Sequence, residues 1–258
     1  MTKHFYLPDT QVKPGFSVEY LANIGHYLVD KQPDVIVMGG DFADMSSLSS
    51  YDGKGTKKHE GQRYIKDIDA AHTAMYALLD PITAHNKKQK TNGKKQYKPR
   101  KVLTLGNHEQ RIIRAINEDP KLEGVMSIGD LEYEKHGWEV YPFLERVIID
   151  GIAYSHYFVT GVAGRPAGTA AAQLRKTNMS SIAGHQQGKQ IAYASRADGK
   201  TITAIIAGSC YEHDEDYLGP QGNADHWRGA LMLHEVHDGS FDEMWLSLNY
   251  LNTRAKQK

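Results

Sequence analysis

Two short, largely apolar runs constrain the fold more than any other feature of the sequence. "PDVIVMGGD" (33–41) and "KVLTLGNH" (101–108) each predict a strand without the polar alternation of a half-exposed sheet. Strands of this kind are buried on both faces, as in a parallel sheet that has layers packed on either side. We therefore predict that both runs lie in the interior of an α/β fold.

Helical spacing flanks the first of these strands. Residues 17–32 carry apolar side chains three or four positions apart, and Ser17 is the predicted N-cap. Residues 62–79 repeat this spacing from Ile65 to Leu79. The first half of the chain therefore predicts alternating strands and helices.

The second half is rich in short strands. Asp150–Gly151 and Asp238–Gly239 each separate two strand-like runs, which predicts two tight hairpins. Three more strands are predicted in "SIAGHQ", "QIAYAS" and "TITAIIAGS". The order of elements favours mixed sheets flanked by helices, and no Pro-, Gly- or Ser-rich break divides them. We predict one domain over residues 1–258.

Charge and cysteine content restrict the class of protein. The chain has 31 acidic and 31 basic residues, so no global field draws it to nucleic acid or to a membrane. The single Cys210 indicates a reducing compartment, and we interpret it as a buried small residue rather than a nucleophile. We expect a cytoplasmic protein, because no secretory leader is visible and no apolar run approaches the ~20 residues that span a bilayer.

Residues 85–100, "HNKKQKTNGKKQYKPR", concentrate positive charge. They hold six lysines and one arginine, and we predict a lysine-rich loop. Two interpretations stay open, a solvated surface loop or an arm that contacts the phosphates of a polymeric anionic substrate. A second polar segment, "YDGKGTKKHEGQR" (51–63), is long enough to line a cleft.

Side chains that can bind metal or transfer protons follow five predicted strands. Sites in α/β sheets form at the carboxyl ends of strands, so we expect these side chains to meet. Each alone is weak evidence, since a strand-end Asp often caps a helix and a lone His is often packed in a core. Five coincidences in one order favour a metal site. The residues are Asp9, Gln11, Asp41, Asp44, Asn107, His108, Glu109, His156, His185 and Gln187.

This order resembles the signature of the calcineurin-like metallophosphoesterases, which is D-x-H, G-D-x-x-D, G-N-H-[DE], a lone H and G-H-x-H. The corresponding blocks are "DTQ" (9–11), "GDFAD" (40–44), "GNHE" (106–109), His156 and "GHQQ" (184–187). "PDTQVKPG" and "YEHDEDYLGPQGNADHWRG" also resemble uncharacterised members encoded by tailed bacteriophages, for which the compartment would be the cytoplasm of the infected host. The resemblance implies a four-layer α/β/β/α sandwich and a metal-dependent phosphoric ester hydrolase.

The resemblance also implies two divalent metal ions bridged by Asp41. The complete ligand set of one metal is Asp41, Asn107, His156 and His185. The ligand set of the other is Asp9, Asp41, Gln11 and Gln187, with the glutamines standing where the family has histidines. Glutamine offers a hard oxygen donor, so this second set favours Mn²⁺ over Zn²⁺, with Mg²⁺ as a further candidate.

Three alternatives stay open for the set that holds the glutamines. The metal binds Gln11 and Gln187 directly or through water, binds only with the substrate phosphate, or is lost to leave a one-metal site. His213, in "SCYEHDED", is a candidate for a missing nitrogen donor or a substrate contact. The acidic run around His213 also fits a solvated turn.

By the same resemblance, His108 is the acid or the phosphate-contacting histidine, and Asp44 keeps its ring protonated. Arg111 is either a phosphate contact or a surface or supporting residue. We predict a phosphodiesterase that acts on nucleic acid or nucleotides through a metal-activated water, which the lysine-rich segment favours. The alternatives are a phosphomonoesterase acting on a small molecule or a protein, and a phosphate-binding module with little turnover. Neither a membrane partner nor an oligomeric state is indicated.

Overall fold

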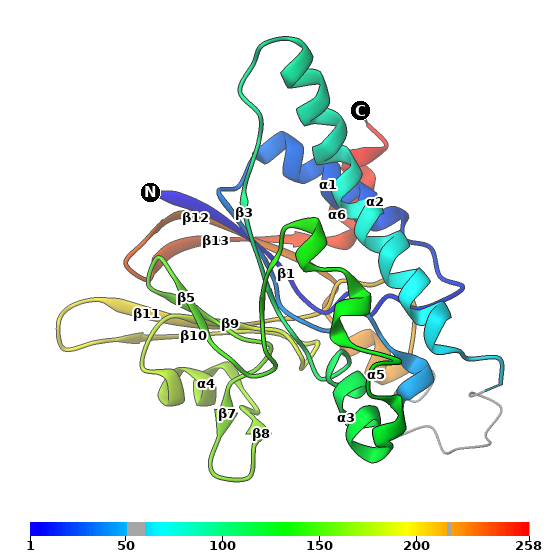
Figure 1. Cartoon of the computed structure of the whole chain (residues 1–258). Helices are drawn as coiled ribbons and strands as arrows, with labels where there is room; N and C mark the ends of the chain where they lie inside the picture. The colour runs from blue at the N-terminus through cyan, green and yellow to red at the C-terminus, as the bar shows by residue number, and fades with distance from the viewer. Residues whose placement is uncertain (51–59, 216–217, 258) are drawn as a thin grey trace.

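The computed structural model describes residues 1–50, 60–215 and 218–257, and the elements below belong to these ranges. Two sheets and the helices packed against them form an α/β fold with mixed strand directions, which confirms the predicted class (Figure 1). Residues 51–59 of the predicted polar segment lie outside the described ranges.

The larger sheet has the strand order β13-β12-β1-β2-β3-β4. Strands β1 to β4 run parallel to one another, and β12 runs antiparallel to both of its neighbours, β1 and β13. Its strands are β1 (Thr2–Leu7), β2 (Val35–Met38), β3 (Arg100–Thr104), β4 (Glu139–Tyr141), β12 (Gly229–His237) and β13 (Ser240–Ser247). The two largely apolar runs supply β2 and β3, which lie inside this sheet as predicted.

The smaller sheet has the strand order β10-β11-β9-β6-β5, in which β9 runs parallel to both β11 and β6. The strands are β5 (Val147–Ile149), β6 (Ile152–Tyr154), β9 (Ser181–Ala183), β10 (Lys189–Ser195) and β11 (Thr201–Ala207), and β7 (Val159–Thr160) pairs separately with β8 (Arg165–Pro166). Both predicted hairpins are confirmed. Asp150 and Gly151 have φ of 49° and 83°, and Asp238 and Gly239 have φ of 46° and 81°, as a tight two-residue turn requires.

Six α-helices and four short 3₁₀ helices connect the described strands. The α-helices are α1 (Glu19–Lys31), α2 (Tyr64–Thr91), α3 (Gln110–Glu118), α4 (Ala170–Thr177), α5 (Gly219–Asp225) and α6 (Leu248–Ala255). The 3₁₀ helices are η1 (Ser46–Leu48), η3 (Pro120–Leu122), η4 (Ile128–Leu131) and η5 (Glu134–His136). The N-cap of α1 is Val18 rather than Ser17, although the Ser17 hydroxyl accepts a hydrogen bond from the amide of Glu19 at 3.2 Å.

The predicted lysine-rich loop is wrong in its first half. α2 continues past Leu79 and through Pro81 to Thr91, so residues 85–91 are helical. Lysine and glutamine are good helix formers, and the first strong breaker in this segment is Gly93. The irregular part of the lysine-rich segment is therefore confined to residues 92–99.

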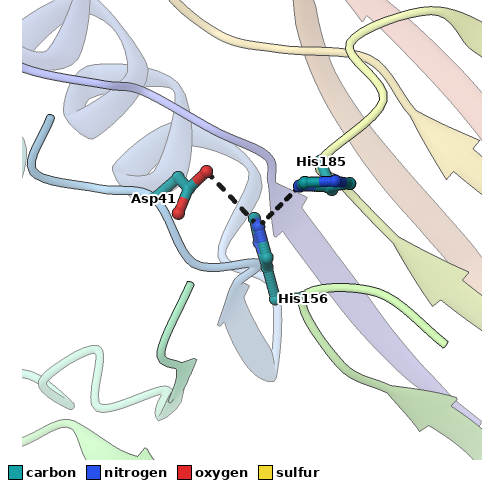
Figure 2. Close-up of side chains that lie close together, drawn as sticks. All are labelled: Asp41, His156 and His185. Atoms are coloured by element: carbon teal, nitrogen blue, oxygen red, sulfur yellow. Dashed lines mark hydrogen bonds and ion pairs between the residues drawn. The ribbon is translucent and has the colours of Figure 1, made fainter. Parts of the chain in front are cut away.

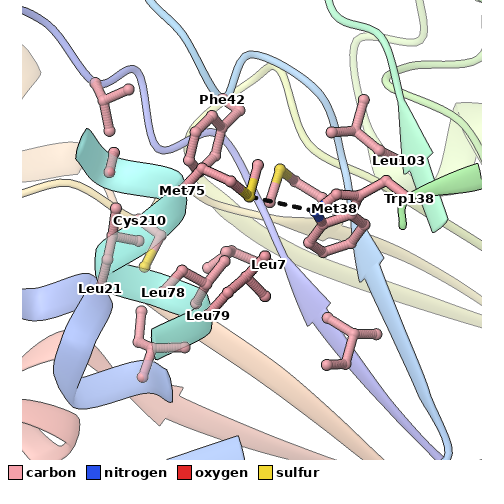
Figure 3. Packing of buried hydrophobic residues seen from close by; sticks show 14 of the residues in the cluster. Leu7, Leu21, Met38, Phe42, Met75, Leu78, Leu79, Leu103, Trp138 and Cys210 are labelled. Atoms are coloured by element: carbon pink, nitrogen blue, oxygen red, sulfur yellow. Dashed lines mark hydrogen bonds between the residues drawn. The ribbon is translucent and has the colours of Figure 1, made fainter. Parts of the chain in front are cut away.

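Alternate residues of the larger sheet face two different cores. Phe5 and Leu7 of β1 pack toward α1, α2 and α6, whereas Tyr6 packs in the apolar layer between the two sheets. Figure 3 shows the first core, in which Met75 and Leu78 of α2 lie above the sheet. On the smaller sheet, α4 packs against β11. This two-sided burial explains why β2 is apolar throughout and why Val102 and Leu103 of β3 are apolar.

Cys210 lies in the first core and is fully buried (Figure 3). Burial raises the pKa of its thiol well above the usual range, so the nucleophilic thiolate is disfavoured. This confirms the interpretation of Cys210 as a packed small residue. No helix in the described ranges is long and apolar enough to cross a membrane.

Gly25 marks the closest approach of α1 to α2 and gives a test of the packing. A Cβ there would lie 2.4 Å from the carbonyl oxygen of Leu78 and 2.9 Å from Cγ of Pro81. We expect Gly25→Ala to lower the free energy of unfolding by about 1–3 kcal/mol, although alanine is the better helix former. Denaturant unfolding measures this, with Ala22→Gly on the same helix as the control for propensity. A more stable Gly25→Ala variant would contradict the described contact.

Candidate metal centre

The residues predicted to bind metal meet where the two sheets end. Asp41 follows β2, Asn107 follows β3, His156 follows β6 and His185 follows β9. β2 and β3 run parallel in one sheet, and β6 and β9 run parallel in the other. The carboxyl ends of strands from both sheets therefore supply one site, as the strand-end pattern predicts.

Three atoms with lone pairs converge on Nε2 of His156. Asn107 Oδ1 lies 2.9 Å away, His185 Nδ1 lies 3.2 Å away, and Asp41 Oδ2 lies 3.3 Å away. Figure 2 shows the two rings and the Asp41 carboxylate pointing toward this common centre. Asp41, His156 and His185 together bring their ligand atoms within 4.8 Å of one another.

The backbone fixes which nitrogen of His156 faces the centre. Nδ1 lies 2.8 Å from the carbonyl oxygen of Gly39, which can only accept, so Nδ1 carries a proton. Nε2 of the neutral ring then presents its own lone pair to the other three. When Nδ1 of His185 is unprotonated as well, four electron-rich atoms face one another, and a cation between them would stabilise this arrangement.

The distances fit a divalent metal ion. Ligands bonded to a metal at about 2.1 Å, with angles of about 90–109°, lie about 3.0–3.4 Å from one another. The separations of 3.2 and 3.3 Å at His156 lie within this range, and the separation of 2.9 Å lies just below it. Two imidazole nitrogens and two oxygens form a mixed donor set that suits Mn²⁺ as well as Zn²⁺.

The pKa values of His156, Asp41 and His185 are all shifted by burial and by the charges of their neighbours. Burial would lower the pKa of His156, but the carboxylates of Asp41 and Asp9 raise it to about 10. Burial would likewise raise the pKa of Asp41, but His108 and His156 hold it well below its usual range. Burial and the His156 charge lower the pKa of His185 to about 4, which keeps its ring neutral. A neutral imidazole is the form that binds metal.

Glu109 holds the loops that carry Asp41 and Asn107. Its fully buried carboxylate accepts hydrogen bonds from the amides of Asp41 (3.0 Å), Ala43 (3.0 Å) and Gly106 (2.9 Å). The hydroxyl of Tyr133 donates a fourth at 3.2 Å. The strand-end pattern includes Glu109 without giving it a role, and its structural role is to join the two loops.

Backbone strain is concentrated at this centre. Gln11, Asp41, His185 and Gln187 all have positive φ, between 42° and 67°. Such values cost roughly 1–2 kcal/mol for a side chain with a Cβ, and they cluster at functional sites. Hydrogen bonds such as that of the Glu109 carboxylate with the Asp41 amide keep these turns in place.

Asp9 supports His185 rather than joining the cluster around His156. Both of its carboxylate oxygens accept from the amide of His185 at 3.0 Å. A Cβ on Gly184 would lie 2.2 Å from Asp9 Oδ1, so this approach needs glycine before the histidine. Burial and the charge of Asp41 raise the pKa of Asp9 to about 7, opposed by the charge of His156.

The two glutamines have different surroundings. Gln11 is buried, and its side chain borders the cleft described below. Oε1 of Gln187 accepts a hydrogen bond from the hydroxyl of Tyr211, which lies 2.9 Å from Nδ1 of His226. The side-chain amide of Gln186 donates to the carbonyl of Ala167. That Gln11 and Gln187 bind the same metal stays a prediction. In the structure, Oε1 of Gln187 is already hydrogen-bonded to the Tyr211 hydroxyl.

His108, Asp44 and Arg111 form a second set beside the cluster. His108 Nδ1 lies 2.8 Å from Asp44 Oδ1, and its amide donates to Asp41 Oδ1 at 2.8 Å. Arg111 is buried and donates to the Asp44 carbonyl at 2.8 Å, and its Nη2 lies 3.2 Å from His108 Nε2. Of the alternatives for Arg111, the surface residue is wrong and the supporting residue is confirmed, since the buried guanidinium contacts both Asp44 and His108.

The neighbours of His108 have opposite effects on its protonation: two carboxylates favour the charged ring, and Arg111 favours the neutral ring. Burial lowers the pKa of His108, but the carboxylates of Asp41 and Asp44 raise it further than burial and Arg111 lower it. The Arg111 guanidinium can only donate, so in the described arrangement it favours a lone pair on Nε2. A group held between these states is suited to proton transfer.

His213 does not join the cluster at His156. Its Nε2 lies 2.9 Å from Glu215 Oε1, which also pairs with Lys13 at 3.0 Å. The ring stacks on Tyr211 with centroids 4.4 Å apart. The predicted nitrogen donor is thus engaged by Glu215, and the acidic run around it pairs with neighbouring cations.

A cleft of about 780 Å³ opens beside the His108 set. Asp44, Asn107, His108 and Arg111 line it. Basic and acidic side chains line it too, among them Lys13, Arg63, Lys66, Glu60 and Glu215. Residues 60–63 belong to the polar segment that the sequence places at a cleft, and this part of the prediction is confirmed.

The lysine-rich segment lies far from the metal centre. α2 begins beside the cleft and ends next to Lys90, so its 28 residues at 1.5 Å each place these ends about 42 Å apart. In Figure 1 the end of α2 is at the top, and α3, which follows Asn107, is at the bottom. The segment therefore lies outside the metal centre, and its interpretation as an arm that contacts the phosphates of a polymeric substrate stays a prediction.

We compared the sequence with protein-family models and with curated proteins. No protein-family model matches the chain, and no curated protein matches it in sequence. Functional inference for this chain therefore comes from its own residues and their geometry.

Glu109 gives a test of how the centre is held. Glu109→Ala would leave buried amides of Asp41, Ala43 and Gly106 without an acceptor, at about 1–3 kcal/mol each. We expect the free energy of unfolding to fall by about 3 kcal/mol or more, with Glu109→Gln intermediate. Denaturant unfolding checks this, and Glu118→Ala, exposed on α3, is the control. Equal losses for Glu109→Ala and the control would show that Glu109 joins nothing.

Proposed function

We propose that this chain is a metal-dependent phosphoric ester hydrolase, a phosphodiesterase that acts on nucleic acid or nucleotides. The observation that carries the proposal is the convergence of Asp41, Asn107 and His185 on His156 Nε2, directly beside the His108 set. The two sheets and their outer helices support the finer proposal of a four-layer α/β/β/α sandwich of the metallophosphoesterase kind.

Two divalent ions, with Mn²⁺ preferred, are part of the proposal. Asp41, Asn107, His156 and His185 would hold the tighter ion, and Asp9, Asp41, Gln11 and Gln187 the weaker one. When bound, the ions would bind phosphate oxygens and lower the pKa of a water from about 15.7 toward 7. The hard oxygen donors of the weaker set support the preference for Mn²⁺.

The side chains of the chain supply positioning and proton transfer. Asp44 holds the His108 ring through Nδ1 at 2.8 Å, which aims Nε2 at the centre, 3.7 Å from Asp41 Oδ2. His108 would deliver a proton from Nε2 to the leaving oxygen, a contribution of typically about 10²–10⁴-fold. Arg111, 10 % exposed at its side chain, would turn from His108 to the substrate phosphate and so release Nε2 for protonation.

The cleft supports a diester with groups on both sides of the phosphate. Its volume of about 780 Å³ exceeds the space that a phosphate alone occupies, and both cationic and anionic side chains line it. A panel of bis-p-nitrophenyl phosphate, p-nitrophenyl phosphate, and single- and double-stranded DNA in Mn²⁺ tests the proposal. Turnover of the monoester alone would favour a phosphomonoesterase, and phosphate binding without turnover would favour a binding module.

His156→Ala tests the metal set. The substitution removes the atom on which the other ligands converge, so we expect loss of tightly bound Mn²⁺. We also expect turnover of bis-p-nitrophenyl phosphate to fall by at least about 100-fold. Metal content and initial rates measure both effects. His26→Ala, on an exposed face of α1, is the matched control. Full metal content in His156→Ala would rule out this ligand set.

The glutamines give a separate test of the weaker ion. If Gln11 and Gln187 share one metal, Gln11→His and Gln187→His should be coupled by about 0.5–3 kcal/mol in affinity for a second equivalent of Mn²⁺. We expect the double variant to bind that equivalent most tightly, although Gln187→His also loses the Tyr211 hydrogen bond. Isothermal titration of wild type, both single variants and the double variant measures the cycle. Strictly additive changes would mean that the two residues do not share a metal.

A further inference from the structure

A second positively charged site lies at the other end of α2 from the metal centre. A cavity of about 720 Å³ opens between the end of this helix, the loop after it and the residues before β2. Four lysines line it, and all four are exposed. They are Lys90, Lys94, Lys95 and Lys98. Two further lysines, Lys87 and Lys88, lie exposed on the preceding turn of α2.

The loop that carries these lysines is fixed by specific contacts. The side-chain amide of Asn86 donates to the Tyr97 carbonyl at 2.7 Å, and its oxygen accepts from the Tyr97 amide at 2.7 Å. The Tyr97 ring is buried, and its hydroxyl donates to the Pro33 carbonyl at 2.9 Å. The lysines therefore project from an ordered loop, so binding through them would need little additional ordering of the backbone.

Negative charge near the cavity is low. Asp34 is the acidic residue in its lining, and the Asp34 carboxylate accepts a hydrogen bond from the Lys3 amide. At the edge of the segment, Glu139 is paired with Arg100 at 2.7 Å. Within the described residues, none of the four lining lysines has an ion pair with a carboxylate closer than 4.0 Å. One or two lysines would suffice to balance the dipole at the end of α2, so the remaining charge needs another explanation.

The lining of the cavity indicates what it binds. Lysine is a point charge that attracts phosphate without the bidentate geometry used to read bases. Tyr97 is the aromatic residue of the lining, and its ring is buried, so it offers no face on which an unpaired base can stack. Phosphate contacts without stacking are typical of binding to the backbone of a duplex.

We propose that the Lys90–Lys98 cavity binds the phosphate backbone of duplex nucleic acid without sequence preference. The cavity lies about 42 Å along α2 from the cleft, so it would hold a part of a polymer that is distant from the hydrolysed bond. The inference extends the proposed function and rests on it for the link to catalysis. Binding itself needs neither the metal centre nor turnover.

Fluorescence anisotropy with a labelled 30-base-pair DNA duplex, in EDTA and over a range of salt concentrations, tests the inference. The triple variant Lys94→Ala/Lys95→Ala/Lys98→Ala is expected to bind at least about tenfold more weakly at low salt. The slope of log affinity against log salt is expected to become shallower by about 3, since each phosphate contact contributes about 0.9. The control Lys121→Ala/Arg175→Ala/Lys176→Ala removes the same charge from exposed positions elsewhere and should leave both values unchanged.

Three results would overturn the inference. They are no binding of the duplex by the wild type, equal losses in the two triple variants, and tighter binding of a single-stranded 30-mer than of the duplex. Turnover of bis-p-nitrophenyl phosphate in Mn²⁺ is measured in parallel and should be the same in wild type and both triple variants. Failure of the proposed function would remove this turnover and leave duplex binding in place, so the two failures are distinguishable.

Discussion

A buried point at which four lone pairs meet governs the arrangement of this protein. His156 Nε2 faces Asp41, Asn107 and His185 at 2.9–3.3 Å, and the Gly39 carbonyl prevents the ring from turning its N–H inward. With Nδ1 of His185 unprotonated, such a site is unfavourable unless a cation occupies it. A proton on His156 or a metal ion can supply that charge, and the donor set suits a divalent metal.

The two sheets are needed because no single sheet supplies all of these atoms. Asp41 and Asn107 follow strands of the larger sheet, whereas His156 and His185 follow strands of the smaller one. The apolar layer between the sheets brings the two sets together. Glu109 then fixes the turns of the larger sheet, and Asp9 reaches across to the turn of His185. Packing between the sheets and buried hydrogen bonds thus hold the strained turns that carry the side chains of this centre.

Residue order and apolar pattern carry much of this information, and three-dimensional contacts carry the rest. The largely apolar runs of β2 and β3 and the Asp-Gly turns predict the strands and hairpins, because burial on two faces and positive φ have clear sequence signals. No sequence pattern predicts three of the contacts at the centre. They are the hydrogen bonds of Glu109 with the loop amides, of the Tyr211 hydroxyl with Gln187, and of His156 with the Gly39 carbonyl. The end of α2 was also unpredictable from apolar spacing, since its last turns are polar and exposed. That extension moves the lysines away from the metal centre.

Anomalous X-ray diffraction from crystals grown with Mn²⁺ would show whether a metal ion occupies this centre. We expect a strong anomalous peak bonded to Asp41 Oδ2, Asn107 Oδ1, His156 Nε2 and His185 Nδ1, with bond lengths of about 2.1–2.2 Å. A weaker peak on the other side of Asp41, toward Asp9 and Gln11, would mark the second ion. Density without an anomalous peak among these four side chains at saturating Mn²⁺ would contradict the account.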